Sequence, residues 1–183
     1  MSNETIENDW LLKTARAICT VLRYILLVFA VIAGVMAALA LIIGLVEGLS
    51  PGFVARFATD PVGVAPAIGM SLLLAAVSYA LWISARFLKL LGMIIDTVGE
   101  GDPFVRDNSD RLREMGRITL IVFGLSVLVT LGGIAYVAMG FPVEGSVEFD
   151  VSVESLLLAL VLFILARVFR HGAAMRADLE GTV

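Results

Sequence analysis

The sequence predicts an all-α membrane protein in which four transmembrane helices form a bundle, with residues 1–183 making one transmembrane domain. Three observations support this fold class. Hydrophobic residues make up 60% of the chain, and the mean hydropathy is +0.99, whereas a soluble domain is about half apolar. The apolar residues are concentrated in long uncharged runs, and the basic residues fall on alternate segments between those runs.

Each predicted helix rests on one of these runs. The runs 24–46, 61–85 and 118–143 contain no charged residue, and each exceeds the ~20 residues that cross a ~30 Å hydrocarbon core. The fourth run, 155–166, is shorter, but 151–169 can span if Glu154 lies at one interface and Arg167 snorkels to the other. We therefore expect helices at about 21–46, 64–91, 109–140 and 152–171, with outer loops 47–63 and 141–151 and an inner loop 92–108.

The segment before the first span is amphipathic. Apolar residues from Trp10 to Leu22 recur at helical spacing. This pattern predicts a helix that lies in the inner interface and runs into the first span.

The distribution of basic residues predicts the orientation. Segments 1–23, 86–117 and 167–183 hold all but one of the 13 Lys and Arg residues, and the segments on the other side hold only Arg56. Because basic residues in short loops stay on the cytoplasmic side, both termini and the central loop are expected to be cytoplasmic.

Two further patterns concern packing and the outer loops. Ala30, Gly34 and Ala38 repeat at four-residue spacing, which lets helices approach closely within one bundle and could also pair two copies into a homo-oligomer. Apolar and acidic residues alternate over 147–154, which predicts a strand with one acidic face that could pair with residues 53–57.

The inner loop contains turn and helix-start signals. Gly101 to Phe104 predicts a turn, and Asn108 or Ser109 could cap the helix that follows. Oppositely charged residues stand three or four apart on that helix, and this spacing predicts the pairs Asp107–Arg111, Asp110–Arg113 and Glu114–Arg117.

The sequence offers no catalytic motif, no cofactor motif and no clear metal site. None of the three long runs contains an ionisable residue of the kind that transporters place at mid-membrane depth. The carboxylates Asp102, Asp107, Asp110 and Glu114 could bind a divalent cation, as in a lipid-transferring enzyme, but arginines are interleaved with them. The basic residues are too mixed with acids for direct nucleic-acid binding. We therefore expect a non-enzymatic protein without a cofactor.

Two segments resemble the signature of one bacterial membrane family. The first matches G-x-P-F-x-x-x-N…L…G and runs from Gly101 to Asn108, followed by Leu112 and Gly116. The second matches F-x-x-G…D-L-x-x-T-V and comprises Phe169 to Gly172 and Asp178 to Val183. These stretches are similar to the domain of unknown function 2975 family of small four-helix membrane proteins. The chain departs from the family's acidic run at Arg176-Ala177-Asp178, which puts any binding role of that run in doubt.

The resemblance implies a partner rather than an activity. Members are often encoded beside a small helix-turn-helix regulator, which implies a cytosolic DNA-binding partner for a regulatory or sensory membrane protein. The expected interaction surface comprises Gly101, Asp102, Pro103, Phe104, Asn108, Arg111, Arg167, Gly172 and Leu179. Alternatively, the loop and the tail pack on each other to close the inner end of the bundle. A small permease or immunity-type protein that handles an apolar compound is the other function that the sequence allows.

Overall fold

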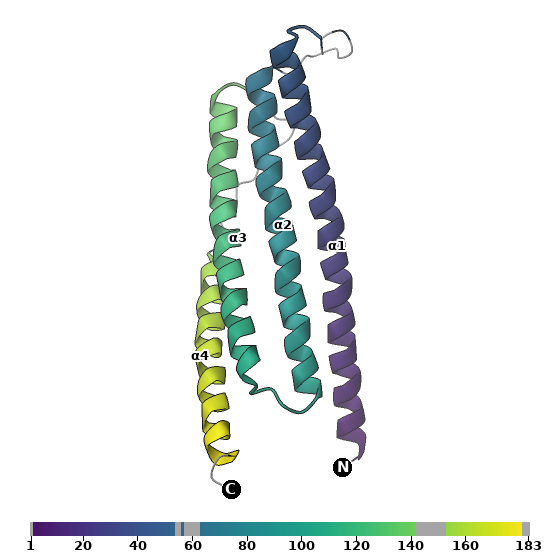
Figure 1. Cartoon of the computed structure of the whole chain (residues 1–183), viewed down its shortest axis with the longest axis vertical. Helices are drawn as coiled ribbons and strands as arrows, with labels where there is room; N and C mark the ends of the chain where they lie inside the picture. Colours follow the sequence, from purple (N-terminus) through teal and green to yellow (C-terminus); the bar gives the residue numbers. More distant parts are fainter. Residues whose placement is uncertain (1, 54–55, 57–62, 142–152, 181–183) are drawn as a thin grey trace. The chain divides into compact units, whose positions relative to one another are not determined.

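The computed structural model describes residues 2–53, 56, 63–141 and 153–180, with side chains described from residue 10 to residue 177. The described residues form four α-helices, α1 (Ser2–Leu49), α2 (Val64–Gly99), α3 (Arg106–Ala138) and α4 (Glu154–Glu180) (Figure 1). The predicted all-α class with four long apolar helices is confirmed.

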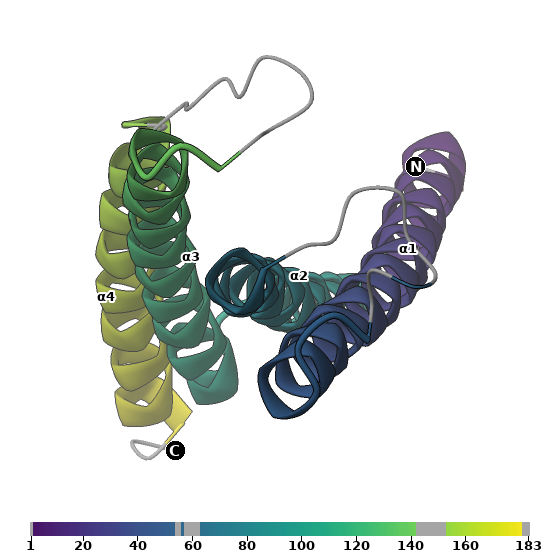
Figure 2. The same ribbon diagram turned by 90° about the horizontal axis from the view of Figure 1, so that it is seen from above.

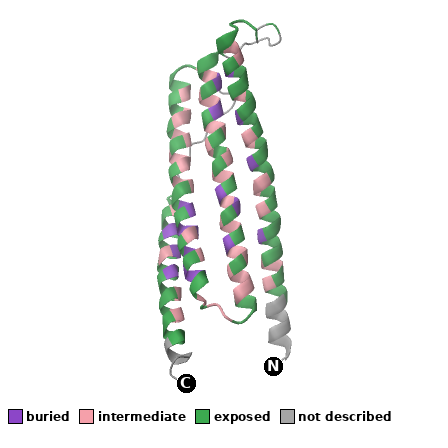
Figure 3. Cartoon of the chain, in the orientation of Figure 1, coloured by how far each residue is buried: buried purple, intermediate pink, exposed green. Residues whose placement is uncertain are grey.

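All four helices are long and apolar enough to cross a membrane. In the most apolar stretch of each helix, only 11% of the residues of α1, α2 and α3 and 17% of those of α4 are buried. Exposed residues run along every helix in Figure 3. An apolar surface of this extent would be unstable in water, whereas lipid tails solvate it. The fold therefore indicates a multi-pass membrane protein.

The helices continue beyond the expected spans. α1 is continuous from Ser2 to Leu49, so the amphipathic segment runs into the first span as expected, and its position in the membrane interface stays a prediction. α2 reaches Gly99 and α3 begins at Arg106, so the expected inner loop 92–108 shortens to 100–105, and α4 continues past residue 171 to Glu180. Hydropathy marks where apolar surroundings end, but a helix continues into water where packing and ion pairs support it.

The predicted outer strand lies almost wholly outside the described residues. Of residues 147–154, the structure describes only Val153, which is in a turn, and Glu154, which begins α4. The proposed partner segment 53–57 is described only at Phe53 and Arg56. The strand and its pairing therefore stay a prediction.

The chain divides into two compact units, each described here by itself. Unit 1 comprises Met1–Leu26, Ile83–Phe123 and Ser152–Val183, and unit 2 comprises Leu27–Trp82 and Gly124–Val151.

Unit 1 has an apolar core where α2, α3 and α4 meet. Its buried members are Ile83, Leu90, Leu112, Met115, Ile118, Leu162 and Ala166. Within this unit α4 lies along α3 (Figures 1 and 2). The approach is close at Gly116, where a Cβ atom would lie 3.1 Å from the ring of Phe163. Small and large side chains thus interlock between these two helices.

Unit 2 is held by small residues that face another helix of the same chain. A Cβ atom on Gly44 of α1 would lie 3.0 Å from Cβ of Ala67 on α2, and Ser78 of α2 donates a hydrogen bond of 2.8 Å to the carbonyl oxygen of Ala30. The buried residue near the middle of this face is Ala37, whereas Ala38 is exposed. Ala38 therefore lies outside the contact face of unit 2, because 3.6 residues per turn shifts that face by one position. Pairing of two copies through this repeat stays a prediction.

Candidate functional site

The short loop of unit 1 begins with a tight helix end. Gly101 has φ +83°; its N–H donates to the carbonyl of Val98, and the N–H of Asp102 donates to the carbonyl of Thr97. Together these bonds form a Schellman motif, in which glycine takes the left-handed conformation without steric cost. The motif satisfies the last carbonyls of α2 and turns the chain toward α3.

Asn108 holds this loop against α2 and α3. Its side chain is completely buried, and its amide nitrogen donates to Oγ1 of Thr97 at 2.7 Å and to the carbonyl of Pro103 at 2.9 Å. Its amide oxygen accepts a 2.8 Å hydrogen bond from Arg111, whose guanidinium also donates to the carbonyl of Met93 at 3.1 Å. Asn108 therefore fixes the loop and is not available at the surface.

This network corrects the predicted helix cap. α3 begins at Arg106, so Asn108 and Ser109 lie inside the helix rather than at its N-cap. Asn108 bonds across to the end of α2, and the hydroxyl of Ser109 donates to the carbonyl of Arg106 at 2.7 Å. The predicted cap rested on residue type alone. A side chain that forms hydrogen bonds to another helix is not available to cap the backbone of its own helix.

The loop packs onto α4. The ring of Phe104 lies 5.2 Å from the ring of Phe169, centroid to centroid. A Cβ atom on Gly172 would lie 2.9 Å from Cδ1 of Phe104, so a larger residue there would force the ring to shift. Asp102 forms an ion pair with Arg176 of α4. The expectation that loop and tail pack on each other is thus confirmed within unit 1.

Ion pairs connect each pair of neighbouring elements of unit 1. Arg16 of α1 pairs with Asp96 of α2, Arg86 of α2 with Glu114 of α3, and Arg170 of α4 with Asp110 of α3 at 3.0 Å. The predicted pair Asp107–Arg111 is present at 4.0 Å. Among the described residues, Asp110 and Glu114 pair with other helices rather than with Arg113 and Arg117. Those two predictions were wrong because sequence spacing shows only neighbours on the same helix.

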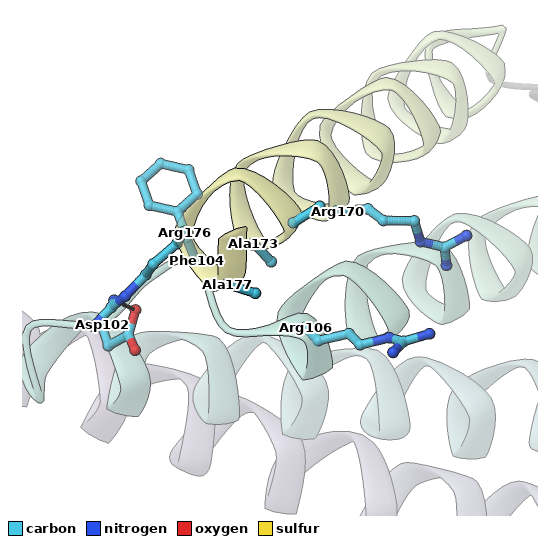
Figure 4. Close-up of a pocket in the computed structure, with 8 residues that line it drawn as sticks. Asp102, Phe104, Arg106, Arg170, Ala173, Arg176 and Ala177 are labelled. Atoms are coloured by element: carbon cyan, nitrogen blue, oxygen red, sulfur yellow. Dashed lines mark hydrogen bonds and ion pairs between the residues drawn. The ribbon is translucent and has the colours of Figure 1, made fainter. Parts of the chain in front are cut away.

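A basic cavity lies between the loop, the start of α3 and the end of α4. Its volume is about 550 Å³, and its lining includes Arg106, Arg170 and Arg176 together with Ala173, Ala174 and Ala177. The alanines leave space beside α4, and Figure 4 shows Arg106 and Arg170 extending in the same direction. Arg170 and Arg176 have carboxylate partners, Asp110 and Asp102. Asp102 also lines the cavity. Arg106 has no carboxylate partner among the described residues, so its positive charge is not neutralised there.

A second, more apolar groove runs along α4. It has a volume of about 790 Å³ and is lined by Phe104, Ile164, Arg167, Val168, His171, Gly172, Met175 and Arg176. Arg167 is exposed at its rim. The groove combines an apolar wall with cationic side chains, a combination suited to an amphipathic ligand.

The inner-loop carboxylates do not gather in one place. Asp102, Asp107, Asp110 and Glu114 each pair with a different arginine. Among the described residues, no three His, Cys, Asp or Glu side chains are placed to hold a metal ion together. The arrangement gives no support to the metal-dependent lipid enzyme considered from the sequence.

The predicted surface residues thus have different positions. Gly101, Pro103 and Asn108 shape the loop, Asp102, Phe104 and Gly172 join it to α4, and Arg111 is half-buried in the Asn108 network. Arg167 lines the groove, and Leu179 lies on α4 with its side chain outside the described ones.

The sequence analysis missed Arg106, Arg170 and the three alanines as members of one cavity. The available signal was the spacing of Arg170, Ala173, Ala174 and Ala177, which places small residues beside an arginine on one face of a helix.

Long apolar helices with a compact, charge-paired loop define a helical multi-pass membrane protein. The family described as protein of unknown function (DUF2975) matches residues 57–183. Because the match covers more than half of the chain, the protein belongs to this family, as its two signature segments indicated. No curated protein matches the chain. No solved structure matches it either.

Proposed function

We propose that this protein is a non-enzymatic regulatory or sensory protein of the bacterial inner membrane, which acts through the cytoplasmic loop and tail on a cytosolic partner. The observation that carries this proposal is the basic cavity of unit 1, which is lined by the loop and by α4. The partner we propose is a small helix-turn-helix regulator, as the family resemblance implies.

The orientation follows from the basic residues. Every Lys and Arg except Arg56 falls within Met1–Leu26, Ile83–Phe123 or Ser152–Val183, which together make up unit 1. Basic residues flanking membrane spans stay on the cytoplasmic side. Both termini and the loop would then face the cytosol, where a DNA-binding regulator is found.

The cavity has the chemistry of a site for an acidic segment. Arg106 lines it without a carboxylate partner among the described residues, and the alanines of α4 leave room for an inserted side chain. Arginine binds carboxylates in a bidentate manner, so an acidic side chain of the partner is the expected ligand.

The family signature and the cavity have separate roles in this proposal. Pro103, Phe104, Asn108 and Gly172 occupy fixed letters of the signature and make packing contacts. Arg106 and Arg170 occupy positions that the signature leaves open. We infer that the fixed residues of the signature hold the loop against α4. The positions that the signature leaves variable would then determine which partner binds.

The test measures the binding of any small helix-turn-helix regulator encoded beside this gene to the full chain in detergent. Arg106→Glu should lower the affinity at least tenfold, because it replaces an attraction for an acidic group by a repulsion. Arg113→Glu makes the same charge change at an exposed residue of α3 that does not line the cavity, and it should leave the affinity unchanged. If the regulator does not bind, or if both variants bind it as the wild type does, the proposal is wrong.

One observation favours the alternative of a small permease or immunity-type protein. The apolar groove along α4 has Arg167 at its rim and could hold an apolar compound that carries an acidic group. This alternative predicts flux or protection that is lost in Arg167→Gln and kept in Arg106→Glu. The regulatory proposal predicts the opposite result, in which function is lost in Arg106→Glu and kept in Arg167→Gln.

A further inference from the structure

A third cavity of unit 1 lies between α1 and α2, away from the loop and from α4. It has a volume of about 200 Å³, and its charged and large apolar lining residues include Arg16, Arg23, Leu88, Lys89 and Asp96. Three of these side chains are cationic, and Asp96 is the only acidic one. The lining therefore has an excess of two positive charges, although Arg16 is already paired with Asp96.

The remaining two cations are available to a ligand. Lys89 is exposed and forms no ion pair among the described residues. Arg23 is half-buried, and its guanidinium lies 5.9 Å from the ring centroid of the neighbouring Tyr24. Neither side chain is neutralised by a carboxylate of the described part of unit 1, so the cavity is complementary to an anion.

The position of the cavity indicates the source of that anion. Arg23 is the last charged residue before the uncharged run 24–46, and Arg86 and Lys89 are the first after the run 61–85. The cavity thus stands where two spanning helices leave the hydrocarbon, at the depth of lipid phosphates. Leu88 adds an apolar wall, and Ile18 and Leu22 are exposed on the same segment of α1.

We propose that this cavity is a binding site for the phosphate of an anionic phospholipid, held by Arg23 and Lys89 between α1 and α2. Basic pockets between transmembrane helices are suited to such headgroups. The Arg16–Asp96 pair holds the two helices together at the cavity. The site is independent of the proposed partner surface.

The experiment uses the full chain, purified in a non-ionic detergent and stripped of lipid. Native mass spectrometry then measures retention of phosphatidylglycerol, phosphatidylcholine and soluble glycerol phosphate, each added separately. We expect one phosphatidylglycerol per chain to be retained, with far less phosphatidylcholine and glycerol phosphate. Lys89→Gln and Arg23→Gln should each lower phosphatidylglycerol affinity about fivefold, the equivalent of ~1 kcal/mol for one cation near a membrane surface.

The controls separate a defined site from general surface charge. Arg113→Gln removes an exposed cation of α3 that does not line the cavity, and it should leave lipid retention unchanged. Lys89→Arg keeps the positive charge, and it should retain the lipid as the wild type does. Circular dichroism verifies that each variant keeps its helices. Equal loss in Arg113→Gln, wild-type retention in Lys89→Gln, or glycerol phosphate binding as tightly as the lipid would each overturn the proposal.

Discussion

Asn108 shows how one buried polar residue organises a loop. Both amide hydrogens and the amide oxygen have partners, on Thr97, Pro103 and Arg111. A buried side chain with this set of bonds specifies a single loop conformation, because every alternative would leave a polar group unsatisfied.

Asn108→Ala should therefore destabilise the protein. The substitution removes three hydrogen bonds and leaves the carbonyl of Pro103 and the hydroxyl of Thr97 without this donor, which costs about 1–3 kcal/mol. Thermal unfolding in detergent measures the loss. Ser109→Ala is the matched control, because its buried hydroxyl bonds only within α3, and it should cost less. Equal stability of the two variants would contradict the assigned role of Asn108.

Gly172 makes a second prediction at the level of one residue. Its hydrogen allows the ring of Phe104 to lie against α4, and a methyl group there would meet Cδ1 of Phe104 at 2.9 Å. Gly172→Ala should force the ring to move and lower stability by about 1–3 kcal/mol, the usual cost of overpacking.

The control for Gly172→Ala is another helical glycine. A Cβ atom on Gly124 of α3 would meet nothing within 4 Å, so Gly124→Ala should be neutral or stabilising by up to about 1 kcal/mol, because alanine favours the helix. The unfolding midpoint should fall in Gly172→Ala and should stay the same or rise in Gly124→Ala. A stabilised Gly172→Ala protein would show that the Phe104 contact is not tight.

At the scale of the elements, the helices contact one another differently in the two units. In unit 2 they meet at small residues, and in unit 1 they are joined by ion pairs and an apolar core. In unit 2 a Cβ atom on Gly132 of α3 would lie 2.8 Å from Cδ2 of Leu73 on α2, and Gly44 of α1 meets Ala67 of α2. Lipid gives little hydrophobic drive for helices to associate, so close backbone approach supplies the attraction.

Gly44→Ile tests this packing. The side chain would collide with Ala67 and with the carbonyl of Val64, which lies 3.5 Å from the position of a Cβ atom. We expect a loss of about 1–3 kcal/mol. Leu45→Ile places the same residue type at an exposed neighbouring position and should change stability by less than about 0.5 kcal/mol. Both are measured by thermal unfolding in detergent, and equal values would show that α1 and α2 do not pack at Gly44.

At the scale of the whole molecule, four apolar helices and one-sided basic residues predict the topology. A fluorescent protein fused after Val183 should fluoresce in the cytoplasm, and an alkaline phosphatase fused after Leu49 should be active on the outside. The protein should also stay in the membrane fraction until detergent is added. Phosphatase activity of a fusion after Val183 would show the opposite orientation. The basic cavity would then face away from the cytosol and from any cytosolic partner.

The sequence by itself determined the fold class, the number of helices among the described residues and the family. Long uncharged runs can be recognised from the sequence alone. Lipid rather than folded protein surrounds such helices, so their length and composition are enough to predict them. The signature segments were also readable, since Gly101, Phe104, Asn108 and Gly172 stand at fixed spacing.

Only the tertiary structure decided what those residues do. Asn108 could be read as a helix cap until Thr97 and Pro103 were found beside it, and Asp110 could be paired with Arg113 until Arg170 of α4 was seen to be closer. Spacing along a sequence reports neighbours on one helix. The two cavities lined by Arg106 and by Lys89 combine side chains from different helices, and such combinations exist only after the helices pack.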